Sequence, residues 1–136
     1  MSVSPVRVLP WIVHEAIEYL AGMFFVLAPF VFGFPEGSAL PVFVGVGVVI
    51  LAVAILSKGP AAVLNVLPYP VHAALDYVLG FFLLLAPFVF GFSSISSALT
   101  ISVLLGLAHL MITLVTSFPT EQPVPAAPAD PTPLVE

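Results

Sequence analysis

The chain has 136 residues, of which 61% are hydrophobic and 7% charged, and its formal net charge at pH 7 is −5. A soluble domain carries about 25% charged residues, so this composition favours lipid over water as the surrounding solvent. The absence of cysteine excludes disulfides, zinc–thiolate sites, iron–sulfur clusters and thiol catalysis. Arg7 and Lys58 are the only Arg and Lys residues of the sequence, which excludes a nucleic-acid-binding surface.

The chain is a tandem duplication. Residues 9–34 read LPWIVHEAIEYLAGMFFVLAPFVFGF and residues 67–92 read LPYPVHAALDYVLGFFLLLAPFVFGF, with sixteen of the 26 aligned positions identical. Residues 38–41 then match 97–100 at an offset one residue larger. Because self-similarity of this kind indicates a repeated structural unit, we expect two copies of one unit.

Each copy contains two apolar runs, and each run can cross about 30 Å of hydrocarbon as a helix. Barrel strands are excluded because the runs lack alternation between apolar and polar residues. The sequence thus predicts an all-α membrane protein with four transmembrane helices in two tandem, parallel-related hairpins. In chain order we expect a short N-terminus (1–8), a first hairpin (9–60), a second hairpin (61–118) and a Pro-rich disordered tail (119–136). The predicted helices span about 11–34, 40–56, 69–92 and 98–116.

Pro29 and Pro87 occupy matching positions inside the first and third runs. Each removes one backbone donor and is expected to kink its helix, which should end near Gly33 and Gly91. Ser38, Ser97 and Thr100 are typical of helix starts.

The distribution of charge and aromatic residues predicts an orientation. Arg7 and Lys58 fall on the same side of the predicted hairpins, so the positive-inside rule places the termini and the central loop in the cytoplasm. Trp11, Tyr69 and Tyr77 lie near that end and suit a belt at the lipid headgroups.

Two matching stripes of polar and small residues interrupt the apolar runs. The stripes are His14, Glu18 and Gly22 in the first copy, and His72, Asp76 and Gly80 in the second. Residues four apart share a helix face, and the glycines allow a neighbouring helix to approach closely. If the first and third helices face each other, the histidines and carboxylates meet in one polar cluster.

Three interpretations of this cluster are open. In the first, each His–carboxylate pair neutralises itself and holds the helix packing, because pairing lowers the cost of charge in the membrane. In the second, His14 and His72 bind a haem or a chlorin, or the histidines and carboxylates together bind a metal ion. In the third, the acids mark a proton path, which is the weakest reading because the FVFGF ends of both copies supply no polar groups.

Two further polar residues have no match in the other copy. Glu15 corresponds to Ala73, so we expect it to face headgroups or water rather than to serve the repeated unit. His109 corresponds to Ile50 and is expected to hydrogen-bond to a neighbour. The sequence contains no Gly-rich phosphate loop, no His-Glu-x-x-His and no Gly-x-Ser-x-Gly, so we expect no enzymatic activity.

The repeat resembles the SPW-repeat family of small bacterial membrane proteins. The family's Ser-Pro-Trp triplet, followed by Gly-Phe, corresponds to Ala28-Pro29-Phe30 with Gly33-Phe34, and to Ala86-Pro87-Phe88 with Gly91-Phe92. The stretch VHAALDY, residues 71–77, is similar to the opening of many members. Both copies replace Ser and Trp, so only the proline of the triplet is kept. The resemblance implies a four-helix membrane fold, a bacterial inner-membrane location and no assigned activity.

The sequence predicts a non-enzymatic membrane protein, either a small homo-oligomer or an accessory subunit of a larger bacterial membrane complex. Its partners would be the lipid bilayer and either other membrane subunits or copies of itself. It requires no cofactor. The alternative is a haem-, chlorin- or metal-binding protein that uses His14 and His72, with Glu18 and Asp76 as ligands or their supports.

Overall fold

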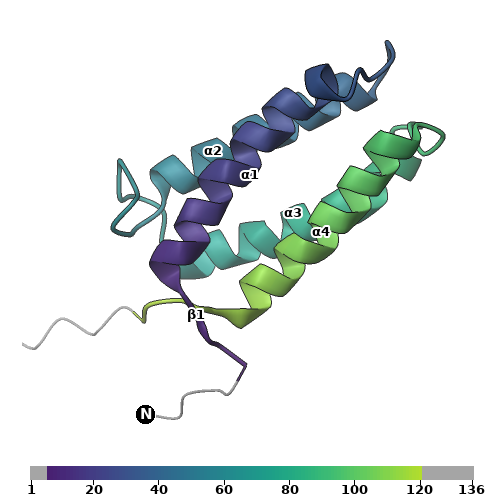
Figure 1. The fold of residues 1–136 in the computed structure, drawn as a ribbon. Helices are drawn as coiled ribbons and strands as arrows, with labels where there is room; N and C mark the ends of the chain where they lie inside the picture. The colour runs from purple at the N-terminus through teal and green to yellow at the C-terminus, as the bar shows by residue number, and fades with distance from the viewer. Residues whose placement is uncertain (1–5, 121–136) are drawn as a thin grey trace, which may run out of the picture.

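A computed structural model describes residues 6–120, and within this range it forms four long helices (Figure 1). They are α1 (Trp11–Val31), α2 (Ala39–Leu56), α3 (Tyr69–Val89) and α4 (Ser96–Val115), with two-residue strands β1 (Leu9–Pro10) and β2 (Thr116–Ser117) at the outer ends. All four helices are long and apolar enough to cross a membrane, which confirms the predicted fold class. The tail beyond residue 120 and its predicted disorder lie outside the described residues.

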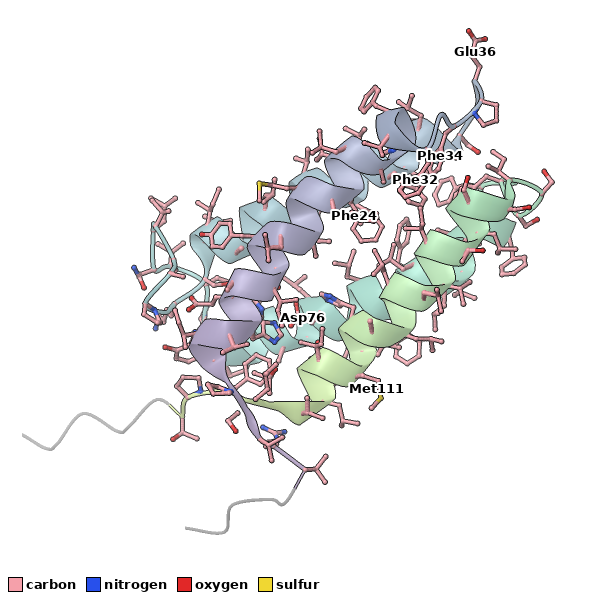
Figure 2. The ribbon with its side chains drawn as sticks, in the orientation of Figure 1. Phe24, Phe32, Phe34, Glu36, Asp76 and Met111 are labelled. Atoms are coloured by element: carbon pink, nitrogen blue, oxygen red, sulfur yellow. The ribbon has the colours of Figure 1, made fainter. Side chains whose placement is uncertain are left out.

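The helices pack as two hairpins, α1 along α2 and α3 along α4 (Figure 1). Both hairpin loops lie at one end of the molecule, and β1 lies at the other end (Figure 1). This arrangement is the one expected of two parallel-related hairpins. In Figure 2, Glu36 stands at the loop end and Asp76 points between the hairpins, while Met111 points outward from α4.

At the end away from the hairpin loops, two short backbone pairings connect the two repeats, and we call these pairings the crossings. β1, before the first hairpin, pairs in parallel with β2, after the second, and Leu9 is the partner of Thr116. The equivalent bridge joins Ser57, after the first hairpin, to Leu67, before the second. The backbone at the start of each repeat is therefore paired with the backbone at the end of the other repeat. Both crossings lie beside the predicted polar cluster.

The first and third helices end in the same backbone motif. Gly33 and Gly91 adopt positive φ angles of 60° and 73°, which favour glycine. The next residues, Phe34 and Phe92, donate their backbone N–H groups to the carbonyls of Pro29 and Pro87 at 2.8 Å and 2.9 Å. This is a Schellman motif, and it ends each helix at Val31 or Val89, three residues before the end of the apolar run. The two prolines consequently lie in the last helical turn.

Aromatic side chains fill the space between the hairpins near the loop end. Phe43 of α2 contacts Phe34 and Phe92, with ring centroids 4.9 Å and 6.0 Å away. Ser38 precedes α2 but makes no capping hydrogen bond; its hydroxyl donates to the carbonyl of Phe90, 2.5 Å away in the other hairpin. The hairpins are therefore joined at both ends, by apolar packing here and by polar contacts at the other end.

Paired glycines set the spacing inside each hairpin. A Cβ on Gly47 would lie 2.6 Å from the carbonyl oxygen of Gly22, and one on Gly106 would lie 3.1 Å from that of Gly80. The predicted close approach at Gly22 and Gly80 is thus made to the other helix of the same hairpin.

Replacing Gly47 with alanine is expected to destabilise the first hairpin by about 1–3 kcal/mol, because the added Cβ would also lie 2.8 Å from the backbone nitrogen of Val26. Gly45→Ala is the matched control, since a Cβ there meets nothing within 4 Å. Thermal unfolding in detergent gives the transition temperature of each variant. Equal transition temperatures for the two variants would contradict the close-packing account.

Candidate polar centre

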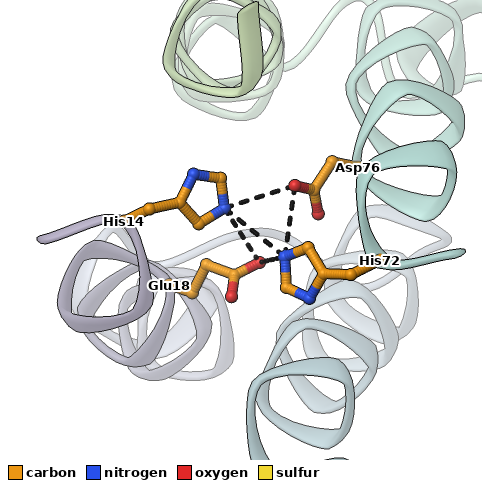
Figure 3. A group of neighbouring side chains, drawn as sticks. All are labelled: His14, Glu18, His72 and Asp76. Carbon is orange, nitrogen blue, oxygen red and sulfur yellow. Dashed lines mark hydrogen bonds and ion pairs between the residues drawn. The ribbon is translucent and has the colours of Figure 1, made fainter. Parts of the chain in front are cut away.

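The structure brings together the four ionisable side chains of the matching stripes. His14 and Glu18 come from α1, and His72 and Asp76 come from α3 (Figure 3). All four are at least 97% buried. The i,i+4 spacing puts each histidine and its carboxylate on one helix face, and the crossings between the repeats bring the two faces together.

One atom of each side chain points to a common centre (Figure 3). Nε2 of His72 lies 3.2 Å from Oε1 of Glu18 and 3.2 Å from Oδ2 of Asp76. Nε2 of His14 lies 3.6 Å and 3.2 Å from the same two oxygens. The two Nε2 atoms are 3.4 Å apart, and all four atoms lie within 4.8 Å of one another.

Hydroxyl groups hold the other nitrogen of each imidazole. Nδ1 of His14 lies 2.7 Å from Oγ1 of Thr116, which donates its own proton to the carbonyl of Ile112 at 2.6 Å. Nδ1 of His72 contacts Oγ of Ser57, which donates to the carbonyl of Val53 at 2.7 Å. Because each hydroxyl proton is already used, each Nδ1 must be the donor.

This hydrogen-bond pattern makes Nδ1 a donor in both rings, as it is both in the neutral Nδ1–H tautomer and in the imidazolium. A neutral imidazole that donates from Nδ1 has a lone pair on Nε2, which is the atom that faces the centre. Ser57 and Thr116 come from the opposite repeat to the histidine that each one holds, so the same backbone crossings orient both rings. The sequence interpretation missed these hydroxyls. The signal was available, since the offset of 59 that aligns the second halves of the repeats also aligns Ser57 with Thr116.

The distances around the centre distinguish direct hydrogen bonds from shared coordination. A charge-assisted N–H···O bond spans about 2.7–2.9 Å. The four N···O distances here, 3.2–3.6 Å, are longer. Four nitrogen and oxygen ligands at about 2.0–2.1 Å around a tetrahedral ion are about 3.3–3.4 Å from one another. The 3.4 Å between the two nitrogens lies in that range, the three N···O distances of 3.2 Å are slightly shorter, and the fourth, 3.6 Å, is longer.

A haem or chlorin bound between the two histidines does not fit this arrangement. A macrocycle bound by both histidines would need the space between the two rings, where the nitrogens are 3.4 Å apart and both carboxylates also point. The donor set fits a small ion. Two imidazole nitrogens and two carboxylate oxygens suit divalent first-row metals, with zinc the usual tetrahedral occupant.

The second oxygens of the two carboxylates have different surroundings. Nε2 of His109 on α4 lies 3.6 Å from Oδ1 of Asp76, and among the described residues it has no hydrogen-bond partner, so the side-chain hydrogen bond expected for His109 is not formed at this nitrogen. Oε2 of Glu18 is buried, and no described residue offers it a hydrogen bond. The position equivalent to His109 in the first repeat is Ile50, which cannot donate.

Aromatic rings cover the imidazoles. The Trp11 ring stacks on His14 at a centroid distance of 5.1 Å and contacts His72 edge-on at 4.8 Å. Phe118 lies 5.6 Å and 6.1 Å from the same two rings. The predicted placement of Trp11 in a headgroup belt is therefore wrong: its side chain is 6% exposed because it packs on the centre.

The expectation for Glu15 is also wrong. Its side chain is fully buried under the loop that follows α2, where Oε2 accepts a hydrogen bond from the backbone N–H of Ala61 at 3.3 Å. A Cβ on Gly59 would lie 2.0 Å from Oε1 of Glu15, so the loop packs directly on the carboxylate. The absence of an acid at the matching Ala73 made the residue look dispensable, because loop contacts of one repeat are invisible in an internal comparison.

Comparisons with known proteins identify the fold family. Searches of curated proteins and of solved structures gave no significant match. The profile of the SPW repeat domain matches residues 10–116, which include all four helices and the polar centre. The chain therefore belongs to the SPW repeat family.

Proposed function

We propose that this protein is a non-enzymatic membrane protein that binds one divalent transition-metal ion between its two hairpins. The ligands are Nε2 of His14 and His72, Oε1 of Glu18 and Oδ2 of Asp76. The observation that carries the proposal is the convergence of these four buried atoms, whose N···O and N···N distances of 3.2–3.6 Å are longer than typical charge-assisted hydrogen bonds and close to the edges of a tetrahedral site.

Charge and burial support the same assignment. Two carboxylates buried at 2–3% exposure require compensating positive charge, which a bound divalent ion would supply while both imidazoles stay neutral. A divalent ion supplies two positive charges at the point where the lone pairs converge. The hydroxyls of Ser57 and Thr116 act as the outer partners that fix the ligand histidines.

A structural role follows from the number of protein ligands. Zinc sites that catalyse reactions keep one position open for water or substrate, whereas structural sites are closed by four protein ligands. The proposed site has four, two from each hairpin, so the ion would join α1 to α3. This supports the expectation that the protein is not an enzyme.

Zinc titration of chelator-treated protein in lipid nanodiscs tests the proposal. We expect saturation at one ion per chain, read by calorimetry and elemental analysis. The single tryptophan provides a second signal, because Cu²⁺ bound beside the Trp11 ring should quench its fluorescence. A protein that binds neither ion in stoichiometric amount would refute the proposal.

The metal-joined bundle is suited to an accessory subunit or to a homo-oligomer. Many large apolar side chains on the outer faces of the helices are exposed, among them Leu20, Phe30, Val78 and Phe88. This surface fits lipid and can also pack against other membrane helices. Native mass spectrometry of gently extracted membranes should show a complex with other subunits or with further copies. A monomer without co-purifying proteins would contradict this part of the proposal.

We place the end that carries the polar centre in the cytoplasmic half of a bacterial inner membrane. Arg7 and Lys58 both lie at that end, where their carbonyls accept bonds from Ser117 and Trp11. The natural chain lacks cysteine, so Glu36→Cys and Val63→Cys report the two ends separately. A membrane-impermeant maleimide added to intact cells should label only the first variant, and labelling of only the second would reverse the orientation.

Removal of the Ser57 and Thr116 hydroxyls, which contact Nδ1 of the two histidines, should weaken metal binding. Ser57→Ala and Thr116→Ala each free one Nδ1 from its partner, and such changes typically lower metal affinity about 10–100-fold. The pseudo-two-fold arrangement predicts similar losses for the two variants. Ser117→Ala is the control, because that hydroxyl donates to the carbonyl of Arg7 and does not contact a histidine ring. Unchanged zinc affinity in both test variants would contradict the assignment of Nδ1 as the donor in both rings.

A further inference from the structure

A pocket of about 410 Å³ lies at the end of the molecule opposite the hairpin loops, where β1 is seen in Figure 1. It is lined by one cation, by hydroxyl groups and by apolar side chains, and its lining includes Arg7, Tyr69, Ala73, Tyr77, Phe118 and Thr120. No acidic residue is among the described residues that line it. We call this space the Arg7 pocket.

In the first repeat, the equivalent space holds the side chain of Glu15. Its Oε2 accepts a hydrogen bond from the backbone N–H of Ala61 at 3.3 Å, and the hydroxyl of Tyr19 donates to the carbonyl of Ala61 at 3.0 Å. A Cβ on Gly59 would lie 2.0 Å from Oε1 of Glu15 and 2.3 Å from Nε1 of Trp11. The carboxylate is thus enclosed between α1 and the loop that follows α2.

The residues around Glu15 and those around the Arg7 pocket occupy equivalent positions of the two repeats. At the two repeat offsets, the residues that enclose Glu15 correspond to four residues of the pocket lining: Trp11 to Tyr69, Tyr19 to Tyr77, Gly59 to Phe118 and Ala61 to Thr120. Glu15 itself corresponds to Ala73, so the second repeat has no carboxylate in this space. Arg7 stands at the position of Asn65, so a cation lies beside the place that the carboxylate leaves free.

We propose that the Arg7 pocket binds the headgroup phosphate of an anionic phospholipid, in the place that the Glu15 carboxylate takes in the first repeat. The Arg7 guanidinium and the hydroxyls of the lining can donate charge-assisted hydrogen bonds to phosphate oxygens. The ammonium group of a zwitterionic lipid would meet no acid in the described lining, which favours a headgroup with net negative charge.

The shape of the pocket favours a lipid over a soluble anion. Arg7 precedes the first helix, whereas Tyr69, Ala73 and Tyr77 follow one face of α3 at spacings of four residues. The pocket therefore extends about 12 Å along α3, from the headgroup level towards the hydrocarbon. A molecule that fills it needs a charged head and an apolar continuation. The inference goes beyond the proposed metal site and is independent of it, because none of the four metal ligands lines this pocket.

Native mass spectrometry of the full chain in detergent tests the pocket. The protein is titrated with phosphatidylglycerol or with phosphatidylcholine that carries the same acyl chains. We expect the first phosphatidylglycerol to bind about fivefold more tightly, which is the effect of one Arg on an anionic lipid at the membrane surface. Glycerol phosphate at the same concentration should not displace it, because it lacks the acyl chains.

Two pairs of variants separate the pocket from the charge of this end of the molecule. Arg7→Gln should abolish the preference for phosphatidylglycerol, whereas Lys58→Gln removes the same charge from a residue outside the pocket lining and should retain it. Ala73→Glu gives the second repeat the carboxylate that Glu15 supplies in the first, so it should take the phosphate position and abolish the preference. Ala74→Glu is the matched control, because its side chain is exposed and does not line the pocket.

Equal binding of the two lipids to the natural chain would overturn the inference. It would also be overturned if the two variants of either pair lost the preference equally, since lipid selection would then depend on total charge rather than on the pocket. Displacement by glycerol phosphate would refute the lipid as the occupant. A natural chain that prefers phosphatidylglycerol but binds no zinc would refute the metal site alone, so the two proposals are tested separately.

Discussion

Zinc binding should be lost when His72 is replaced by alanine, and lost to the same extent when His14 is replaced. Each substitution removes one of four direct ligands. It leaves two buried carboxylates with a single imidazole, at 3.2 Å and 3.6 Å from Nε2 of His14 or at 3.2 Å from Nε2 of His72. Changes in outer partners cost about 10–100-fold in metal affinity, so the loss of a direct ligand should exceed that range. Competition with a chromophoric chelator in nanodiscs measures the affinity.

The chain provides a matched control for these two variants. His109 is a mostly buried histidine, with its side chain 11% exposed, and its Nε2 faces Oδ1 of Asp76 rather than the common centre. His109→Ala should retain one zinc ion per chain with affinity reduced far less than in His72→Ala. If all three histidine variants lose affinity equally, the assignment of two histidine ligands is wrong.

Metal removal should strongly lower the stability of the contact between the hairpins. An ion that binds only the folded state at a thousand times its dissociation constant contributes about 4 kcal/mol. The effect should be concentrated at this contact, because each hairpin has its own paired glycines whereas the polar centre joins α1 to α3. Thermal unfolding in detergent, with and without a zinc chelator, gives the shift.

The His72→Ala variant separates metal removal from other effects of the chelator. Its transition temperature should lie below that of the natural chain and should not respond to chelator. A chelator that lowers both transition temperatures by the same amount would show that the stabilising ion, if present, binds elsewhere.

The residues of the polar centre were predictable because two local rules agreed. The i,i+4 spacing placed each histidine and carboxylate on one face, and the duplication indicated that the two faces belong to equivalent helices. Glycines at the end of each FVFGF segment likewise located the helix ends, since Gly33 and Gly91 supply the positive φ angles of the Schellman motif.

Features that depend on contacts between distant segments were not predictable in this way. Thr116 reaches His14 across 102 residues. The repeat offset pairs Thr116 with Ser57, but it does not indicate that each hydroxyl contacts the histidine of the other repeat. Trp11 was assigned to the headgroups from its position at a helix end, but the pairing of β1 with β2 at that end places Phe118 and both imidazoles against its ring. Burial of Glu15 depends on the course of a loop, which the repeat comparison does not constrain.

X-ray absorption spectroscopy of the zinc-loaded protein would identify the metal ligands themselves. Zinc in the proposed site should show four nitrogen and oxygen ligands at about 2.0–2.1 Å, with scattering at longer distance from two imidazole rings. In His72→Ala, at zinc concentrations high enough to fill the weakened site, the imidazole scattering should correspond to one ring. A longer, six-coordinate oxygen shell without imidazole scattering would contradict the account.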